Sequence, residues 1–234
     1  LNLALDSNTH YWININHKLI DKVAPERINI ELQKLAQAPW ADDVLCLLKD
    51  IGLLNSWKNT GEDFDNIAPS ISTAQNLTNN ELLQALPLAR LTHLLSNDGL
   101  DRLRFSRKQC NRCQLLRKWK LRNDGLAFQT LKEVDRLELH QDLEDDLPAL
   151  ILELPLADQV VWLNRWRDIN DPLFHPSSPV DGRVLLDYLE LSPGPQLGQI
   201  IRHLCHERAF GRLRNRQEAL TAARYWLEQN QTLL

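Results

Sequence analysis

The 234-residue sequence predicts an all-α protein, organised as a multi-helix array. In one segment after another, apolar residues recur at spacings of three and four, which is the period of a helix with one buried face. Capping residues open many of these segments, and Pro or Gly closes several of them. No segment alternates with period two, and aromatic residues, which favour strands, make up only 6% of the chain. The sequence therefore favours helices throughout.

Three helices are expected before residue 55. The first has Thr9 as its candidate N-cap, and its apolar face has four members: Trp12, Ile15, Leu19 and Val23. The second begins at Pro25, because a proline in the first turn lacks an N–H that would be unpaired there anyway. It stops near Pro39. The third runs from about Ala41 to Gly52, where glycine favours a C-terminal stop.

The middle of the chain carries further helix signals. Thr78 and Glu81 form a capping box, and the Leu-rich helix behind it is expected to kink or split at Pro87 and to end at 97–99 (Asn-Asp-Gly). Ser106 opens a basic helix over about 107–121. More helices are expected at about 126–140, 147–154 and 156–169.

The last quarter reads as a helix, a Pro-Gly-Pro turn, a second helix, a Gly-bearing turn and a third helix capped at 215–218. Two polar, broken stretches, near 59–76 and 170–179, read as linkers. They divide the chain into helical subdomains at 1–58, 77–169 and 180–234.

The net charge of −4 hides a strongly uneven distribution of charge. Nine cations and no acid occupy 102–122: Arg102, Arg104, Arg107, Lys108, Arg112, Arg117, Lys118, Lys120 and Arg122. In residues 133–158 the charge reverses, with nine acids and a single cation, Arg136. The tail is basic again, at Arg202, Arg208, Arg212, Arg214 and Arg216. A polyanion responds to local potential, so this chain can bind RNA despite its net charge.

Several other classes of site are not supported. No apolar run approaches the roughly 18 residues of a membrane span, and four cysteines in a chain this long indicate a reducing cytosol. Cys110 and Cys113 form a CxxC with no second ligand pair nearby, so we expect thiols on one helix face rather than a zinc or redox site. His203 and His206 also share a helix face. We expect no catalytic residue and no metal site in this chain.

Residues 23–35, VAPERINIELQKL, resemble the neck motif of class II tRNA nucleotidyltransferases, the CCA-adding enzymes of the poly(A) polymerase family. Residues 87–98 are similar to the first body helix of that family, and the Gly-Pro pair ahead of 197–198 (Leu-Gly) is similar to its tail. The resemblance implies that Glu26, Arg27 and Glu31 brace the neck fold. It also implies that the body and tail hold the acceptor arm and elbow of tRNA. The implied RNA-binding residues are the nine cations of 102–122 with Gly194, Pro195, Gly198, Arg202, Arg208, Arg212 and Arg216.

The catalytic motifs of that family have no match here: an Asp-x-Asp pair, an Arg-Arg-Asp segment and a Glu-Asp-x-x-Arg nucleotide template. There is no Met, and 1–5 lack the basic start of a signal peptide. We therefore expect a processed product or a piece of a longer cytoplasmic protein, which lacks the catalytic head and is inactive alone. Mg²⁺ with CTP or ATP is implied for that head, and tRNA is the expected partner. Whether the parent enzyme adds CCA, only CC, only the terminal A or poly(A) stays open.

Two rival interpretations remain. In a helical protein-interaction or regulatory scaffold without RNA binding, the cations of 102–122 would pair with the acids of 133–158 instead of facing solvent. In a helix-turn-helix DNA binder built from the tail, the last helix would read bases with Asn215, Arg216 and Gln217.

Overall fold

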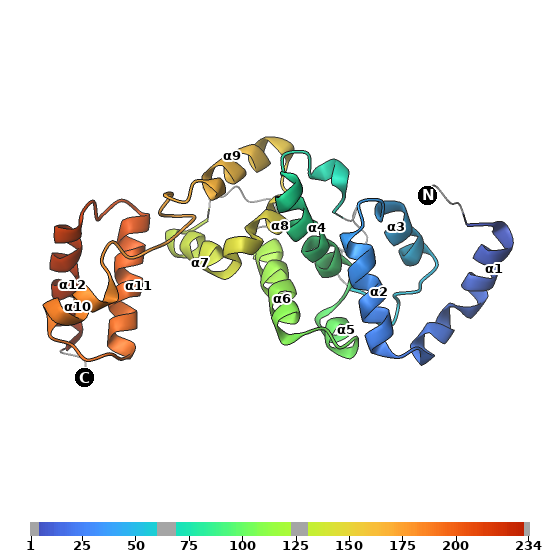
Figure 1. The fold of residues 1–234 in the computed structure, drawn as a ribbon, viewed down its shortest axis with the longest axis horizontal. Coiled ribbons are helices and arrows are strands. Elements are labelled where there is room, and N and C mark those ends of the chain that lie inside the picture. Colours follow the sequence, from blue (N-terminus) through green and yellow to red (C-terminus); the bar gives the residue numbers. More distant parts are fainter. Residues whose placement is uncertain (1–4, 60–68, 123–130, 232–234) are drawn as a thin grey trace. The chain divides into compact units, whose positions relative to one another are not determined.

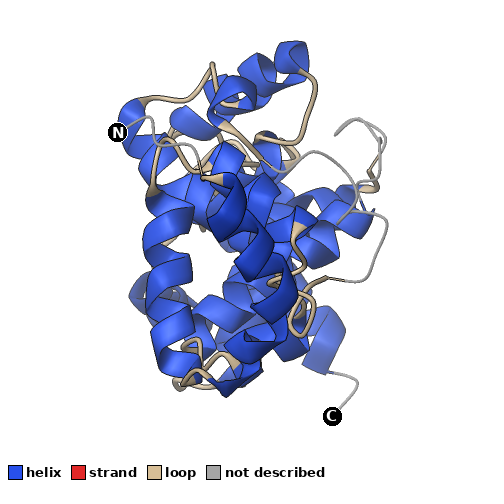
Figure 2. Ribbon diagram, turned by 90° about the vertical axis from the view of Figure 1, so that its right-hand side faces the viewer, coloured by secondary structure: helices blue, strands red, loops and turns tan. Residues whose placement is uncertain are grey.

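The computed structural model describes residues 5–59, 69–122 and 131–231. In these ranges the chain is all-α, with helices and loops and no strand (Figure 2). In chain order the helices are α1 (Ser7–Asn16), η1 (His17–Lys22), α2 (Pro25–Gln37), α3 (Asp42–Asp50), η3 (Ile71–Thr73), α4 (Asn79–Leu94), α5 (Asn97–Arg102), α6 (Arg107–Arg122), α7 (Glu133–Leu143), η5 (Glu144–Asp146), α8 (Leu147–Ile151), α9 (Leu156–Arg167), α10 (Gly182–Leu189), α11 (Pro195–Ala209) and α12 (Arg216–Gln231). No described helix is long and apolar enough to cross a bilayer.

The helices group into two compact units. The first comprises the described residues of 1–125 and 145–163, and the second those of 126–144 and 164–234. The division into 1–58, 77–169 and 180–234 stays a prediction.

Helix α4 forms the centre of the first unit. It packs against α2, α6 and α8 (Figure 1), and its second half is buried on all sides, from Ala85 to Leu94 except at Pro87. From α6, Leu116 and Trp119 are fully buried, and every residue of α8 is buried. Burying a large apolar side chain stabilises a fold by roughly 1.5–3 kcal/mol, so α4 and its neighbours form the core of this unit.

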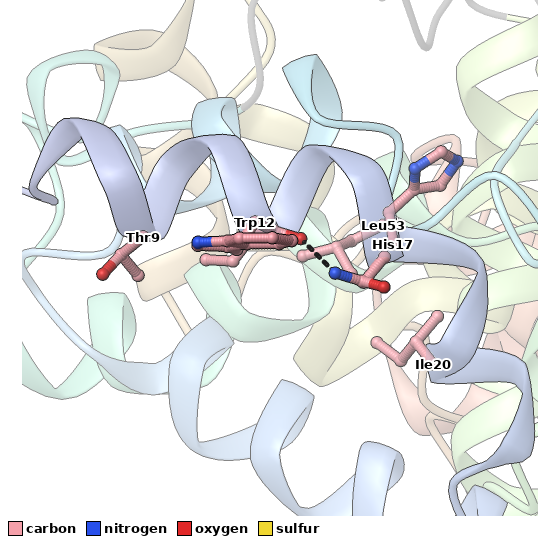
Figure 3. Close-up of a pocket in the computed structure, with 7 residues that line it drawn as sticks. Thr9, Trp12, His17, Ile20 and Leu53 are labelled. Atoms are coloured by element: carbon pink, nitrogen blue, oxygen red, sulfur yellow. Dashed lines mark hydrogen bonds between the residues drawn. The ribbon is translucent and has the colours of Figure 1, made fainter.

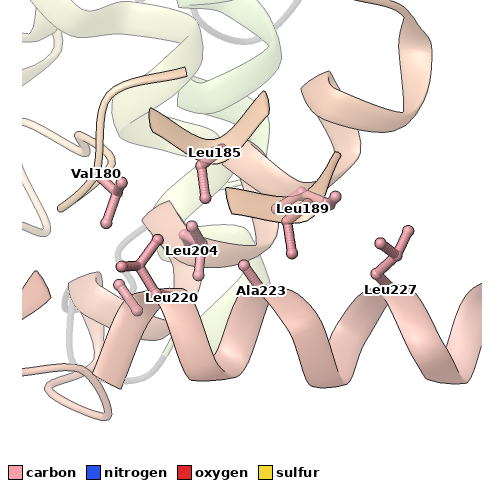
Figure 4. Close-up of a cluster of buried hydrophobic side chains, with 9 residues drawn as sticks. Val180, Leu185, Leu189, Leu204, Leu220, Ala223 and Leu227 are labelled. Atoms are coloured by element: carbon pink, nitrogen blue, oxygen red, sulfur yellow. The ribbon is translucent and has the colours of Figure 1, made fainter. Parts of the chain in front are cut away.

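The second unit contains a three-helix cluster made by α10, α11 and α12. Leu185 and Leu189 from α10, Leu204 from α11, and Ala223 and Leu227 from α12 meet in one hydrophobic cluster (Figure 4). The spacings of three and four residues along each helix produce these faces. The tail helices therefore share a core.

Many expected boundaries are confirmed. Pro25 begins α2, and α6 begins at Arg107 with Ser106 Oγ accepting the amide of Gln109 at 3.2 Å. The capping box is formed, because Thr78 N donates to Glu81 Oε2 at 2.7 Å and Glu81 N donates to the Thr78 hydroxyl at 3.4 Å. Helix α4 continues through Pro87 without splitting. The start expected for the helix at 126–140 lies outside the described residues.

Two expectations about helix ends are wrong. Asp6, not Thr9, caps α1, because its carboxylate accepts the amides of Asn8 at 3.0 Å and Thr9 at 3.1 Å. Residues 97–99 (Asn-Asp-Gly) do not end α4. They begin α5, whose N-cap Ser96 accepts the amide of Gly99 at 2.9 Å. A Cβ at this glycine would lie 2.1 Å from the Trp57 carbonyl oxygen, so close packing requires Gly there.

Candidate nucleic-acid interface

The basic helix α6 has a buried face and two charged flanks. Cys110, Cys113, Leu116 and Trp119 line the buried face at spacings of three. The two thiols are buried and free, as expected for a helix face, and burial raises the pKa of Cys110 to about 11. No three His, Cys, Asp or Glu residues in the described part of the chain gather as a metal-ligand group. The cations on the flanks fall into two sets.

The first set is paired inside the protein. Arg112 makes a bidentate ion pair with Asp146, through Nε–Oδ2 at 2.8 Å and Nη2–Oδ1 at 2.6 Å. The hydrogen bonds that Arg112 donates to the Asp146 carboxylate raise the pKa of its guanidinium. Lys120 Nζ lies 2.7 Å from Glu153 Oε2, and both side chains are mostly buried. These two cations join α6 to the acidic segment that surrounds α8.

Arg117 also acts inside the fold. Its guanidinium donates to the carbonyl oxygens of Thr92 at 2.9 Å and Leu95 at 2.6 Å, and to the side chain of Asn97. The last carbonyls of a helix lack intrahelical donors, and an arginine can supply them. Arg117 therefore closes the C-terminal end of α4.

The second set faces solvent. Arg107 and Lys108 are exposed in the first turn of α6 and, across the described ranges, make no ion pair or hydrogen bond. That turn holds no acidic residue. Cations at a helix N-terminus are disfavoured by the helix dipole, whose positive end lies there. The two charges therefore carry a small energetic cost that no described contact offsets.

Two of the other cations of 102–122 precede this turn in the sequence, and two lie near the C-terminal end of α6. Arg104, an exposed residue with a φ of 61°, lies 3.7 Å from Glu26 of α2. Arg102 is exposed, donates to the Ser56 carbonyl at 2.8 Å and lies 3.6 Å from Asp98. The remaining two lie over the Trp119 ring, at 4.9 and 5.3 Å from its centroid: Lys118 and Arg122.

The neck-motif residues lie on α2 beside an apolar hollow of about 340 Å³. Arg27 and Glu31 line this hollow, and Glu31 accepts a hydrogen bond from Lys34 at 2.9 Å. Within the described residues Arg27 makes no ion pair, so the structure gives it no bracing partner. Glu26, by contrast, forms the ion pair with Arg104 described above. The buried polar contact of this segment is instead made by Asn29, whose amide donates to the Leu103 carbonyl at 3.0 Å.

Sequence reasoning missed Arg90, the fully buried arginine of α4. Its Nη1 donates to the carbonyl oxygens of Ala36 at 2.8 Å and Ala38 at 2.9 Å, and its Nη2 pairs with Asp42. The signal available in the sequence is that Arg90 is the single Lys, Arg, Asp or Glu in the Leu-rich run from Leu86 to Leu95. Arg90 fixes the connection between α2 and α3.

Helix α1 presents its apolar residues to solvent. Trp12 is 61% and Ile15 55% exposed, and no residue of α1 is buried. Figure 3 shows Thr9, Trp12 and Ile20 beside a shallow hollow of about 480 Å³. Only Trp12 and Ile15 of the expected apolar face lie on α1, because the α-helix ends at Asn16 and a 3-10 helix, η1, follows. The expected single helix from Thr9 to Val23 is therefore wrong.

The tail carries its own exposed cations. Arg202 and Arg216 are exposed and have no hydrogen-bond or ion-pair partner in the described segments. Two other cations have local partners: Arg208 donates to Ser177 Oγ at 2.8 Å, and Arg212 pairs with Glu207 at 3.3 Å. The start of α12 is capped internally, because Asn215 Oδ1 accepts the amide of Glu218 at 2.9 Å.

The turn before α11 has the expected form. Gly194 is the N-cap in an extended conformation, and Pro195 occupies the first turn. Gly198 is exposed, and a Cβ there would meet no atom within 4 Å. Internal packing therefore does not require this glycine, although glycine in an exposed helix costs about 1 kcal/mol relative to alanine.

Comparison with known proteins gives two findings. Residues 2–58 match the family described as "Probable RNA and SrmB- binding site of polymerase A". Nearly the whole chain aligns with curated CCA-adding enzymes. It is 27% identical to the enzyme of Lactococcus lactis subsp. cremoris (strain MG1363), with 97% of this chain and 56% of that enzyme aligned. It is 29% identical to the enzyme of Limosilactobacillus reuteri (strain DSM 20016), with 94% and 55% aligned.

These matches fit the C-terminal portion of a CCA-adding enzyme. The chain spans only about half the length of the curated CCA-adding enzymes that it matches. The resemblance drawn from the neck motif and the tail is confirmed. Which cations contact RNA stays a prediction, for which the structure offers the solvent-facing set.

Proposed function

We propose that this chain is the tRNA-holding portion of a cytoplasmic CCA-adding enzyme and binds the acceptor arm and elbow of tRNA by shape and backbone charge. In this proposal, nucleotide transfer with Mg²⁺ and CTP or ATP belongs to the part of such an enzyme that the chain does not span. The chain alone therefore binds tRNA without transferring a nucleotide.

The observation that carries the proposal is the position of Arg107 and Lys108. Both cations occupy the first turn of α6, where the helix dipole disfavours them, and neither has an internal partner in the described ranges. An RNA phosphate at this turn would be attracted by both side chains and by the helix end itself. Arg102 and Arg104, which precede the turn in the sequence, are also exposed, although each lies near a carboxylate, that of Asp98 or Glu26.

The tail offers a second contact surface. Arg202 and Arg216 are exposed, and the open space around Gly198 allows a phosphate backbone to approach α11 closely. Two separate positive surfaces suit a folded RNA, whose recognition depends on shape and backbone more than on base sequence.

The test is filter binding of tRNA to the full 234-residue chain and to the double variant Arg107→Ala/Lys108→Ala. Each lost phosphate contact reduces the slope of log K against log salt by roughly 0.7–0.9, so the double variant is expected to bind more weakly and with a slope lower by about 1.5. The matched control, Arg107→Lys/Lys108→Arg, keeps both charges and is expected to bind normally. Equal binding by the alanine variant and the wild type would exclude this turn as the contact.

A scaffold function has one observation in its favour. Arg112 and Lys120 pair with Asp146 and Glu153, as that rival required. The solvent-facing cations separate the two ideas, because the scaffold requires the cations of 102–122 to pair with the acids of 133–158, whereas Arg107 and Lys108 are exposed. A chain that binds no tRNA at low salt would favour the scaffold.

A further inference from the structure

The second unit contains a hollow of about 470 Å³, bounded by α7, α11 and α12. Its volume falls in the range of roughly 300–1,000 Å³ that is typical of small-molecule pockets. The hollow is lined by aromatic rings from the tail and by polar side chains: Trp226, His203, His206, Arg202, Gln199 and Gln141. Arg202 is the one predicted RNA-binding residue among those that line the hollow.

The aromatic wall is fixed in place by the tail core. Trp226 packs against the hydrophobic cluster of α10, α11 and α12 while it lines the hollow. The His203 ring lies beside it, with 6.1 Å between centroids and 30° between planes. Burial is the main cause that lowers the pKa of His203, which favours the neutral imidazole. A flat, uncharged, aromatic surface of this kind suits stacking.

The polar side chains that line the hollow include a cation, two amides and a carboxylate. Arg202, Gln199 and Gln141 are exposed, and each lacks a hydrogen-bond partner in the described part of the chain. Glutamine amides both donate and accept hydrogen bonds, as the edges of nucleobases require. Glu138 also lines the hollow, and its carboxylate disfavours a phosphate inside. An anionic group is therefore excluded from the interior and attracted to the rim at Arg202.

We propose that this hollow receives one unpaired base of the bound RNA, which stacks on the Trp226 and His203 rings while its phosphate lies at Arg202. The inference rests on the proposed function, since RNA is the ligand of both. It adds a contact that a paired RNA stem cannot make, because stacked and paired bases are not free to enter. The tail then distinguishes an RNA with a looped-out base from a plain duplex.

The test compares tRNA with a fully paired RNA duplex, using the full chain, the variant Trp226→Ala and two controls. Stacking of one base on an aromatic side chain changes affinity by roughly 5- to 150-fold. Trp226→Ala is expected to weaken tRNA binding at least fivefold and to leave duplex binding unchanged. Trp226→Phe, which keeps a ring, is expected to retain most of the affinity. Tyr225→Ala removes an exposed aromatic ring next in sequence that does not line the hollow, and it is expected to have no effect.

The outcomes separate the two proposals. If folded Trp226→Ala binds tRNA as the wild type does, the base-binding site is excluded while the proposed function stands. If the wild type binds neither RNA, the proposed function itself fails. Should Trp226→Ala not fold, photocrosslinking of 4-thiouridine-substituted tRNA to the wild type decides. Crosslinks at Trp226 or His203 support the site, and crosslinks found only elsewhere overturn it.

Discussion

Replacing Arg90 by alanine tests whether this buried arginine stabilises the first unit by holding α2 and α3 together. The Arg90 side chain is fully buried, and it satisfies the carbonyl oxygens of Ala36 and Ala38 at the end of α2 while it pairs with Asp42 at the start of α3. Each buried acceptor left without a donor costs about 1–3 kcal/mol. Breaking a buried ion pair from one side costs about 3–5 kcal/mol.

The Asp42 side chain is 38% exposed, so water can solvate the carboxylate that remains. The free-energy cost of breaking the ion pair between Arg90 and Asp42 is therefore at the low end of that range, about 3 kcal/mol. With about 1 kcal/mol for each of the two carbonyl oxygens and about 3 kcal/mol for the ion pair, we expect Arg90→Ala to lower the free energy of unfolding by about 5 kcal/mol, which is a large part of the roughly 5–15 kcal/mol of a typical domain.

The assay is urea unfolding followed by circular dichroism, with hydrogen exchange to locate the loss in α2 and α4. Arg107→Ala is the matched control, because it removes an exposed arginine from another helix and is expected to change stability by less than about 0.5 kcal/mol. A loss below about 1 kcal/mol in Arg90→Ala would refute the bracing role.

Two further predictions concern the other charged groups. His140 is buried, and burial, followed by the nearby Arg165, lowers its pKa to about 3. The unfolded chain then binds one more proton below pH 6.5, so stability falls as the pH drops from about 6.5 towards 3, by about 1.4 kcal/mol at pH 5.5. His140→Phe should remove this part of the pH dependence in urea titrations at pH 7.5 and 5.5, and an unchanged pH dependence would contradict the reasoning. Arg112→Ala leaves Asp146 without its bidentate partner and should cost about 2–3 kcal/mol, with little change in the salt dependence of tRNA binding. A reduced salt slope without a loss of stability would instead make Arg112 an RNA contact.

The local structure was largely predictable from the sequence, because its causes are local. The capping box at Thr78 and Glu81, the proline that opens α2 and the serine before α6 all act within one helical turn. The apolar period of three to four residues likewise accounts for the burial of Ile28 and Leu32 on α2.

The unpredicted features depend on contacts between distant segments. Apolar spacing in α1 predicts a hydrophobic face, but it cannot say whether another element covers it, and Trp12 is exposed. The pairing of Arg112 with Asp146 joins residues 34 positions apart, so charge patterning alone could not separate that arginine from Arg107. The burial of Arg90 depends on its contacts with the segment between α2 and α3, which lies about 50 residues earlier in the sequence.

The most direct test of the central claim is the salt dependence of tRNA binding by the full chain. Filter binding over a series of salt concentrations gives the slope of log K against log salt, which counts the phosphates that the protein neutralises. The account predicts measurable binding at low salt and a slope of magnitude at least about 2, from contacts on α6 and on the tail. No binding at low salt, or binding that does not change with salt, would contradict it.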